Sequence, residues 1–438
     1  MPESPRSSFW KWWVCGVLLL ATFLNYADRQ TLAVSLPELK QRFHIGEARV
    51  GLLEGCFGFA FAAGSVLFGF LADRIGPRRL YPAVLVGWSC AGIATAFAGH
   101  PELTGHLEGP DDARGTGPFR WLLICRTLLG FCEAGHWPCA LLTARQVLAA
   151  KDRPLGNAIL QSGASLGAVL IPLYAEVVER NGAEWHFAFW TVGVLGLLWV
   201  PLWFALVRTS DFADPPPPAA VESDGAGAVA FARRLFVLAV VVSCLNVSWQ
   251  FLRAWLPLFL QDFHQIPREP TRVIVVAFFL ASDAGCVLAG ALVKSLAARG
   301  WEVDAARRAG FFVFTLLAAS AAAVPFAGEG WLMVGLLIVA GMGVLGLHPY
   351  YYAFAQDLPH RRMGLYSGGL AALAWVVASA FQITIGAEIQ ESKSYDVGLV
   401  IGGLAPAAGL AALLFVWPRR ISPQRHKDHT KEHEEEMT

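Results

Sequence analysis

The sequence has 438 residues, of which 55% are hydrophobic and only 16% are charged, and its net charge is zero. Soluble domains carry about 25% charged residues, so this composition excludes an ordinary soluble protein and predicts an integral membrane protein. The zero net charge gives no reason to expect a nucleic-acid partner, and none is expected.

Apolar runs recur along the whole chain. A helix needs about 20 apolar residues to cross a bilayer. Twelve such spans are predicted, at 12–36, 50–72, 80–99, 120–147, 156–178, 186–208, 235–260, 272–297, 309–327, 331–355, 364–386 and 398–417. They predict an all-α membrane protein with 12 transmembrane helices in two pseudo-symmetric six-helix bundles.

A proline-rich segment separates the two sets of six spans. It holds four consecutive prolines and cannot build a core, so it is interpreted as a linker. The predicted organisation is an N-terminal bundle at 1–208, a cytoplasmic linker at 209–234, a C-terminal bundle at 235–417 and a cytoplasmic tail at 418–438.

The distribution of Lys and Arg predicts the orientation. The even-numbered connections and the two termini carry 22 of these residues, and the odd-numbered connections carry 9. Because cytoplasmic loops are enriched in Lys and Arg, both termini are expected in the cytoplasm. In a bacterium the protein would lie in the inner membrane.

The chemistry-bearing residues do not predict an enzyme. The eight cysteines fall inside predicted spans, none at zinc-ligand spacing, and are interpreted as small buried hydrophobic residues. No nucleotide-binding loop and no catalytic triad pattern is present. We therefore expect neither a metal site nor catalysis.

Charged residues inside the first and fourth spans draw attention because they are costly there. A charge at the bilayer centre costs about 2.5–3.5 kcal/mol on insertion scales. Asp28 and Arg29 lie in the first span; Arg126 and Glu133 lie in the fourth, two helical turns apart on one face. Two arginines and two carboxylates sum to zero, which makes their burial tolerable. Protonation of one carboxylate would leave a positive site, so proton and anion affinities should be linked.

The loop after the second span carries a second pattern, G-x-x-x-D-R-x-G-x-R-R, from Gly69 to Arg79. Asp73, Arg74 and Arg78 are predicted to act in gating, by capping a helix end or by pairing with carboxylates across the bundle. This pattern resembles the signature loop of the major facilitator superfamily, and the resemblance implies the two-bundle fold of that family.

Three further stretches carry a closer resemblance. They are Asn25–Arg29, Arg126–Pro138 and Gln161–Ala168. Together they are similar to the anion:cation symporter branch, which includes hexuronate, galactonate and glucarate carriers. The resemblance implies a proton as the coupling ion and no other cofactor.

The same resemblance implies roles for individual residues. Arg29 would bind the carboxylate of the substrate, and Asp28 and Glu133 would carry protons. Arg126 would be the partner that adjusts the proton affinity of Glu133. The alternative is an inert network of buried charges that fixes the register of the helices.

Some positions depart from the pattern of the branch or remain ambiguous. Phe61 stands where the branch often has a tyrosine, so one expected hydroxyl is missing. His136 is expected to bond to Glu133 or to substrate, or else to be a packing histidine. Glu54 lies near the end of the second span and is expected to reach water.

The C-terminal half carries weaker signals. Arg253 either extends to the membrane interface or forms a second anion contact, which would favour a substrate with two carboxylates. Asp283 is predicted as a gating partner. The other predicted substrate contacts are Tyr26, Gln161, Asn246, Trp249 and Tyr351.

The leading hypothesis is a monomeric proton-coupled symporter that imports a sugar acid (a hexuronate, hexonate or aldarate) by alternating access. Its partners would be the small organic anion and the lipid bilayer. One alternative is an exchanger or uniporter for an aromatic acid, a monocarboxylate or an organophosphate. Another is a non-transporting anion receptor, which would need a cytoplasmic output domain larger than the linker and tail provide.

Overall fold

The computed structural model describes residues 9–109, 115–148, 153–182, 184–208, 211, 225–356 and 363–418. Within these residues the protein is helical and has no strand. The first group of helices is α1 (Trp10–Phe43), α2 (Glu47–Ile75), α3 (Pro77–Thr95), the short α4 (Pro101–Thr104), α5 (Thr116–Glu133), α6 (His136–Val147), α7 (Arg153–Arg180) and α8 (His186–Leu206). The second group is α9 (Gly225–Leu258), α10 (Arg268–Ala298), α11 (Val303–Ala318), α12 (Trp331–Gly346), α13 (His348–Gln356), α14 (Met363–Ser392) and α15 (Asp396–Phe415).

Twelve membrane crossings follow from these helices, as the sequence predicted. Several crossings are interrupted: α5 and α6 share the fourth, α12 and α13 share the tenth, α9 runs on into a π-helical turn, and α11 continues as a 3₁₀ helix. Among the described residues, 9 helical segments satisfy length and hydropathy criteria for a span. The other three crossings, α1, α3 and α5 with α6, are more polar and include Asp28, Arg29 and Arg126.

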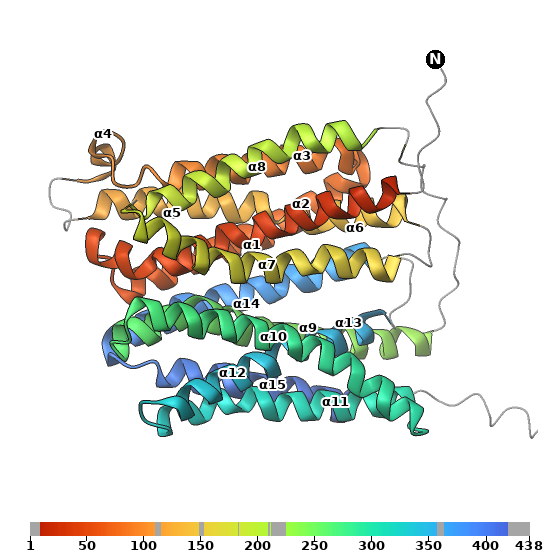
Figure 1. Ribbon diagram of the computed structural model, residues 1–438. Helices are drawn as coiled ribbons and strands as arrows, with labels where there is room; N and C mark the ends of the chain where they lie inside the picture. Colours follow the sequence, from red (N-terminus) through yellow and green to blue (C-terminus); the bar gives the residue numbers. More distant parts are fainter. Residues whose placement is uncertain are drawn as a thin grey trace, which may run out of the picture.

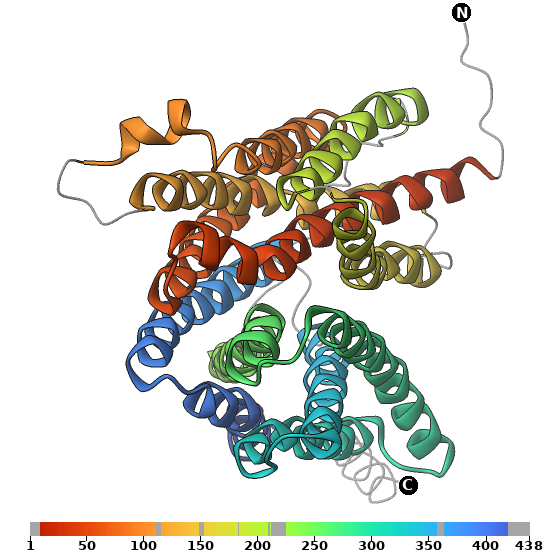
Figure 2. The ribbon, with the colours of Figure 1, turned by 60° about the vertical axis from the view of Figure 1, so that its left-hand side comes forward.

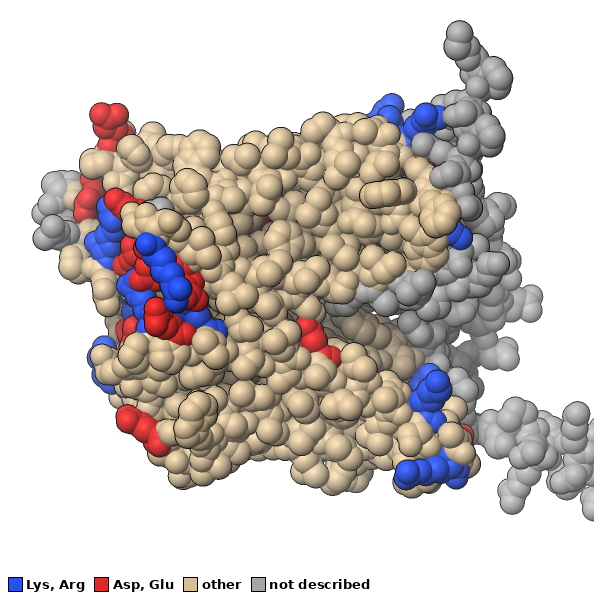
Figure 3. All heavy atoms as spheres, viewed as in Figure 1, with Lys and Arg blue, Asp and Glu red and all other residues tan. Residues whose placement is uncertain are grey.

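The crossings form two six-helix bundles (Figure 1). Helices α1–α8 make one bundle and α9–α15 make the other, and Figure 2 shows the two groups from another side. The face in Figure 3 is largely free of Lys, Arg, Asp and Glu between its two ends, as a lipid-facing surface requires. The protein is therefore a multi-pass membrane protein.

The two ends of the bundles carry different connections. The α1–α2 end is where α1 connects to α2, on the left of Figure 1, and the α2–α3 end is the opposite one. The sequence predicts the α1–α2 end to be outside the cell and the α2–α3 end to be cytoplasmic.

The bundles touch mainly where α14 packs along α2. Close approach there depends on small residues. A Cβ atom at Gly51 would lie 2.3 Å from the backbone oxygen of Gln382, and one at Gly55 would lie 2.4 Å from Ile383 Cγ1. Because both glycines lie in the first turns of α2, the two bundles meet closely near the α1–α2 end.

The start of the second bundle differs from the predicted boundary. Helix α9 already begins at Gly225, so residues 225–234 of the predicted linker are helical. This stretch has alanine at every second position from 226 to 232, and alanine has the highest helix propensity. Residues 212–224 of the predicted linker and 419–438 of the predicted tail lie outside the described residues.

Candidate functional site

A buried ion pair joins the first and fourth crossings. Arg29 Nε on α1 donates to Glu133 Oε2 on α5 over 2.7 Å, and their side chains are 4% and 0% exposed. Each keeps an unused atom: in the part of the chain that the structure describes, Arg29 Nη2 and Glu133 Oε1 have no hydrogen-bond partner. Buried polar atoms are normally satisfied, so this pair has capacity left for a ligand.

Four aromatic rings surround the Arg29 guanidinium. Its carbon lies 5.3 Å from the ring centre of Tyr26, 5.2 Å from Phe57, 5.1 Å from Phe61 and 5.6 Å from Trp375. Trp375 belongs to α14, so both bundles contribute to this cage. Phe61, which replaces an expected tyrosine, contacts the guanidinium with its ring. Cation–π contacts of this kind hold an arginine without using its hydrogen-bond donors.

Glu54 forms a second buried charge cluster, which contradicts the expectation that it reaches water. Its Oε1 accepts from Arg126 Nη2 over 2.8 Å, and its Oε2 accepts from Arg253 Nη2 over 2.5 Å. The three side chains are only 2–5% exposed. Arg253 therefore does not extend to the interface. Helices α2, α5 and α9 bring these charges together from distant parts of the sequence, which no local pattern reveals.

The ion pair of Arg126 also corrects an expectation. Arg126 was predicted to be the partner of Glu133, but it pairs with Glu54, and Arg29 pairs with Glu133. Seven residues along a helix rise about 10 Å, so Arg126 and Glu133 share a face at different depths. Arg126 still acts on Glu133 through its charge. Its guanidinium carbon lies 4.2 Å from the Phe57 ring, which also contacts Arg29.

Asp28 points to a different neighbour from Arg29. It is buried, and among the described residues its Oδ1 has no hydrogen-bond partner. Oδ1 lies against α3, 3.0 Å from where a Cβ of Gly92 would be. The charges that act on it are those of Glu133, Arg126 and Arg29. Adjacent residues on a helix face different directions, and the structure follows this rule.

His136 has protein partners on both ring nitrogens. Thr22 Oγ1 donates to the Leu18 carbonyl, so it accepts from His136 Nε2 over 3.2 Å. Nδ1 then accepts from the Tyr81 hydroxyl over 2.8 Å. The ring is fully buried. This geometry is that of the packing alternative, and among the described residues no bond joins His136 to Glu133.

The predicted contacts on α9 form a chain that leads to the Glu54 cluster. Asn246 Oδ1 accepts from Gln250 Nε2 over 3.3 Å, and Gln250 Oε1 accepts from Arg253 Nε over 2.8 Å. Trp249 faces another way, with its ring stacked on Phe278 at 6.2 Å inside the second bundle. Trp249 therefore packs in the core.

The tyrosines of α13 also divide into two environments. Tyr351, the predicted contact, is buried beside Tyr352 with 5.3 Å between ring centres. Tyr352 is half-exposed. Sequence reasoning selected Tyr351, because periodicity alone could not determine the environment of each ring on α13.

The arginines of the signature loop have local partners. Arg78 Nε donates to the Val207 carbonyl over 3.1 Å, and the Arg74 guanidinium carbon lies 4.2 Å from the Phe70 ring. Among the described side chains neither arginine forms the ion pair with a carboxylate across the bundle that the sequence predicted. Arg78 joins the start of α3 to the end of α8, and Arg74 packs on a ring of its own helix.

Three other predicted site residues remain. Asp283 on α10 interacts with Ser165 on α7, so it lies between the bundles, and its role in gating stays a prediction. The side chains of Asp73 and Gln161 lie outside the described part of the structure.

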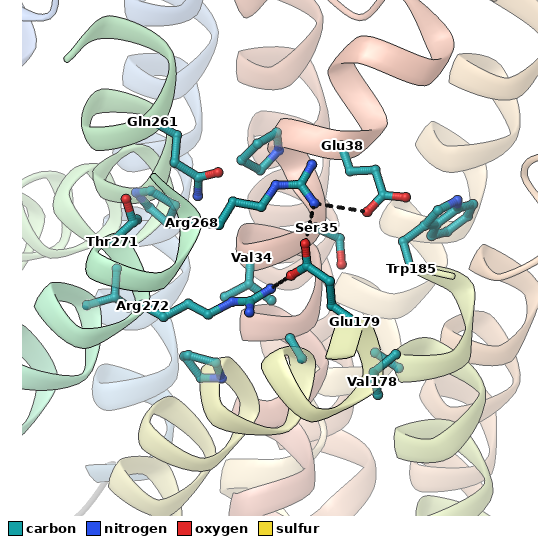
Figure 4. Close-up of a pocket in the computed structure, with 16 residues that line it drawn as sticks. Val34, Ser35, Glu38, Val178, Glu179, Trp185, Gln261, Arg268, Thr271 and Arg272 are labelled. Atoms are coloured by element: carbon teal, nitrogen blue, oxygen red, sulfur yellow. Dashed lines mark hydrogen bonds and ion pairs between the residues drawn. The ribbon is translucent and has the colours of Figure 1, made fainter. Parts of the chain in front are cut away.

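Ion pairs close the α1–α2 end between the bundles. Arg268 Nη1 on α10 lies 2.9 Å from Glu179 Oε1 on α7 and 3.9 Å from Glu38 Oε2 on α1, and Arg272 also pairs with Glu179 (Figure 4). The charges gather where the two bundles meet (Figure 3). These pairs were missed because charges at helix ends are ordinary. The one available signal was the opposite charge of Glu179 in the first bundle and of Arg268 and Arg272 in the second.

A further contact at this end joins Lys40 of α1 to Asp262, beyond the end of α9. Lys40 also lies 3.1 Å from Glu47 at the start of α2. The α1–α2 end is thus closed by several charged contacts as well as by the α2–α14 packing.

The site can bind an anion through its arginines. Unused donors of three buried arginines, namely Arg29 Nη2, Arg126 Nε and Arg253 Nη1, have no partner among the described residues. Within those residues no group of histidine, cysteine, aspartate and glutamate could hold a metal ion. Buried arginine donors suit carboxylates and other planar anions.

Comparison with known proteins identifies the family. The pattern described as Major Facilitator Superfamily matches residues 18–383. A probable sulfoacetate transporter of Cupriavidus necator is 23% identical over 92% of this chain and 93% of that protein. A hexuronate transporter of Escherichia coli is 21% identical over 86% of this chain and 87% of that protein. A probable L-galactonate transporter of the same bacterium is 25% identical over 93% of this chain and 90% of that protein.

Two solved structures share the fold. A D-xylose–proton symporter has a TM-score of 0.71 at 15% identity, covering 93% of this chain and 97% of its own. A bacterial homologue of the human lysosomal transporter Spinster has a TM-score of 0.67 at 16% identity, covering 94% and 95%. The relatives are transporters and not enzymes. With its two six-helix bundles and its buried charges, the chain belongs to the Major Facilitator Superfamily.

Proposed function

We propose that this transporter is a proton-coupled symporter that imports a sugar acid, such as a hexuronate or hexonate, by alternating access. Arg29 is the residue that binds the carboxylate of the substrate, and Glu133 is the residue that carries the coupling proton. Asp28 is a second protonatable carboxyl that faces α3.

The observation that carries the proposal is the half-used ion pair between Arg29 and Glu133. Arg29 gives its Nε to Glu133 and keeps Nη2 free. An arginine binds a carboxylate best through two parallel N–H groups. When a proton neutralises Glu133, its hold on Nε weakens, and Nε and Nη2 become available to the substrate. Loss of the proton lets Glu133 recapture Nε and displace the anion.

The choice of a sugar acid rests on the relatives and on a hydroxyl group near the site. The relatives are named as transporters of galactarate and D-glucarate, hexuronate and L-galactonate, besides sulfoacetate. Tyr26, whose ring contacts the Arg29 guanidinium, carries a hydroxyl beside the site. Hydroxyls of this kind both donate and accept hydrogen bonds, which suits the hydroxyls of a sugar.

Alternating access assigns a role to the charged contacts at the α1–α2 end. We place this end outside the cell, following the distribution of Lys and Arg. The pairs of Glu179 with Arg268 and Arg272 hold the outer entrance closed. They must separate before a substrate can enter from outside, and they form again when the site opens to the cytoplasm.

Uptake by purified protein in proteoliposomes tests the proposal. A panel of labelled sugar acids is offered with and without an inward proton gradient. We expect accumulation of at least one hexuronate or hexonate only with the gradient, and about tenfold accumulation per pH unit for one proton per anion. Arg29→Lys is expected to lose most of this uptake. Equal uptake without a gradient would contradict the coupling, and uptake of neutral sugars alone would contradict the role of Arg29.

A further inference from the structure

The Glu54 cluster is not used by the mechanism above, although it lies beside it. Phe57 contacts the guanidinium groups of both Arg29 and Arg126, so one aromatic ring lies between the two charge clusters. Arg253, the other partner of Glu54, is an arginine of the second bundle. Glu54 is thus a carboxylate of the protein that lies between one arginine of each bundle.

Glu54 occupies the arginines in the way a ligand carboxylate would. Each of its oxygens accepts one hydrogen bond, Oε1 from Arg126 Nη2 and Oε2 from Arg253 Nη2. A carboxylate held between guanidinium groups is the arrangement by which arginines bind organic acids. Both Nη2 donors are thereby taken by the protein itself.

The donors that remain near Glu54 are isolated ones. Arg126 Nε and Arg253 Nη1 are buried and have no partner within the described ranges. A second substrate carboxylate would have to bind these donors beside Glu54 and would meet the negative charge of Glu54 in a buried place. A neutral hydroxyl meets no such repulsion. A site that places a like charge against one ligand discriminates against it.

We propose that Glu54 determines specificity: it supplies from the protein the carboxylate that Arg126 and Arg253 would otherwise take from a substrate. The transporter therefore selects organic acids with one carboxylate over matched acids with two. This inference rests on the proposed function and narrows its substrate class to monocarboxylate sugar acids. It predicts the opposite of the preference that a second anion contact at Arg253 would give.

Binding to the purified full-length protein tests the inference with matched pairs of acids. D-gluconate and D-glucarate have the same carbon chain and differ in one terminal carboxylate, and D-galactonate and galactarate form a second such pair. For the wild-type protein we expect the monocarboxylate of a pair to bind at least about tenfold more tightly. A wild-type preference for the dicarboxylate would overturn the inference without any variant.

Variants then assign the preference to Glu54. Glu54→Gln is expected to improve the Kd of the dicarboxylate at least about tenfold and to change the Kd of the monocarboxylate by less than about threefold. Glu54→Asp retains the charge and is expected to retain the wild-type preference. The double variant Glu54→Gln/Arg253→Gln removes one buried charge of each sign, and it is expected to lose the gain in dicarboxylate binding.

The outcomes separate this inference from the proposed function. If wild-type protein and Glu54→Gln bind both acids of a pair in the same ratio, the inference is wrong and the sugar-acid function stands. If neither protein binds any acid of either pair or any hexuronate, the proposed function fails and the inference falls with it. A folded Glu54→Gln protein is recognised by a monodisperse elution profile. If it aggregates, the wild-type comparison of the two pairs still decides, because a preference for the dicarboxylate overturns the inference.

Discussion

At the scale of single residues, Arg29 is held in place by four aromatic rings and by one ion pair with Glu133. Four aromatic side chains contact its guanidinium, and only Nε is used by a carboxylate. Such contacts contribute about 0.5–2 kcal/mol each depending on desolvation. They keep the arginine buried while its donors stay free, which a fully hydrogen-bonded arginine could not do.

Replacing Glu133 by glutamine tests the role of its proton. Glutamine cannot ionise, so its bond to Arg29 Nε does not strengthen when the pH rises. We expect Glu133→Gln to abolish accumulation driven by a proton gradient and to retain exchange of labelled for unlabelled substrate. Glu176→Gln is a matched control, because Glu176 pairs with Arg180 on its own helix, away from the site. Normal accumulation by the Glu133 variant would exclude Glu133 as the coupling residue.

His136 is predicted to act on stability and not on affinity. Its replacement by leucine leaves the Tyr81 hydroxyl buried without its partner, and an unsatisfied buried group costs about 1–3 kcal/mol. We expect a lower melting temperature for His136→Leu and a substrate Kd within about threefold of wild type. The readouts are thermal unfolding and equilibrium binding. A large loss of affinity in a protein of normal stability would restore His136 to the binding site.

Sequence reasoning located part of this site. It expected Asp28, Arg29 and Glu133 to be buried together, and they are. It missed the environment of Glu54. Hydropathy near the outer end of a span does not reveal that Arg253, which lies 199 residues later in the sequence, contacts this carboxylate. The partners of His136 were likewise hidden, since Thr22 and Tyr81 come from other helices.

At the scale of helices, the number and order of the crossings could be read from hydropathy, while their interruptions could not. The break between α5 and α6 follows Glu133 directly, at Ala134 and Gly135. A long apolar run predicts a span but not whether it contains a break. The early start of α9 was missed because its alanine-rich stretch adjoins the prolines and was assigned with them.

Reversal of a charge at the α1–α2 end is predicted to weaken its closure. Arg272 and Arg268 face Glu179 across the bundle interface, so Glu179→Arg places like charges together. We expect faster labelling of a cysteine introduced at Ser35, which lines the same pocket, by a membrane-impermeant maleimide. The double variant Glu179→Arg/Arg272→Glu restores opposite charges and is expected to return labelling toward the original rate.

Two controls accompany that measurement. Glu176→Arg makes the same charge change on the same helix, but the pair that it removes lies within α7. It is expected to leave the labelling rate unchanged. Labelling that is equally slow in Glu179→Arg would mean that the α2–α14 packing closes this end without help from the ion pairs.

At the scale of the whole molecule, the buried charges lie where the two bundles meet. Glu54 of the first bundle holds Arg253 of the second, and Trp375 of the second bundle contacts Arg29 of the first. The same interface is closed by charges at the α1–α2 end. A rearrangement of the two bundles therefore changes the surroundings of the site and the state of the entrance together, which is what alternating access requires.

The central claim is that Glu133 and the substrate carboxylate bind Arg29 in turn, so that anion binding takes up a proton. Addition of a bound sugar acid to purified protein in weakly buffered solution measures this directly. We predict uptake of about one proton per anion, and a Kd that weakens about tenfold per unit rise in pH above the titration of Glu133. In Glu133→Gln this proton uptake should be lost. Tight binding by the wild-type protein with no proton taken up, and a Kd independent of pH, would contradict the account.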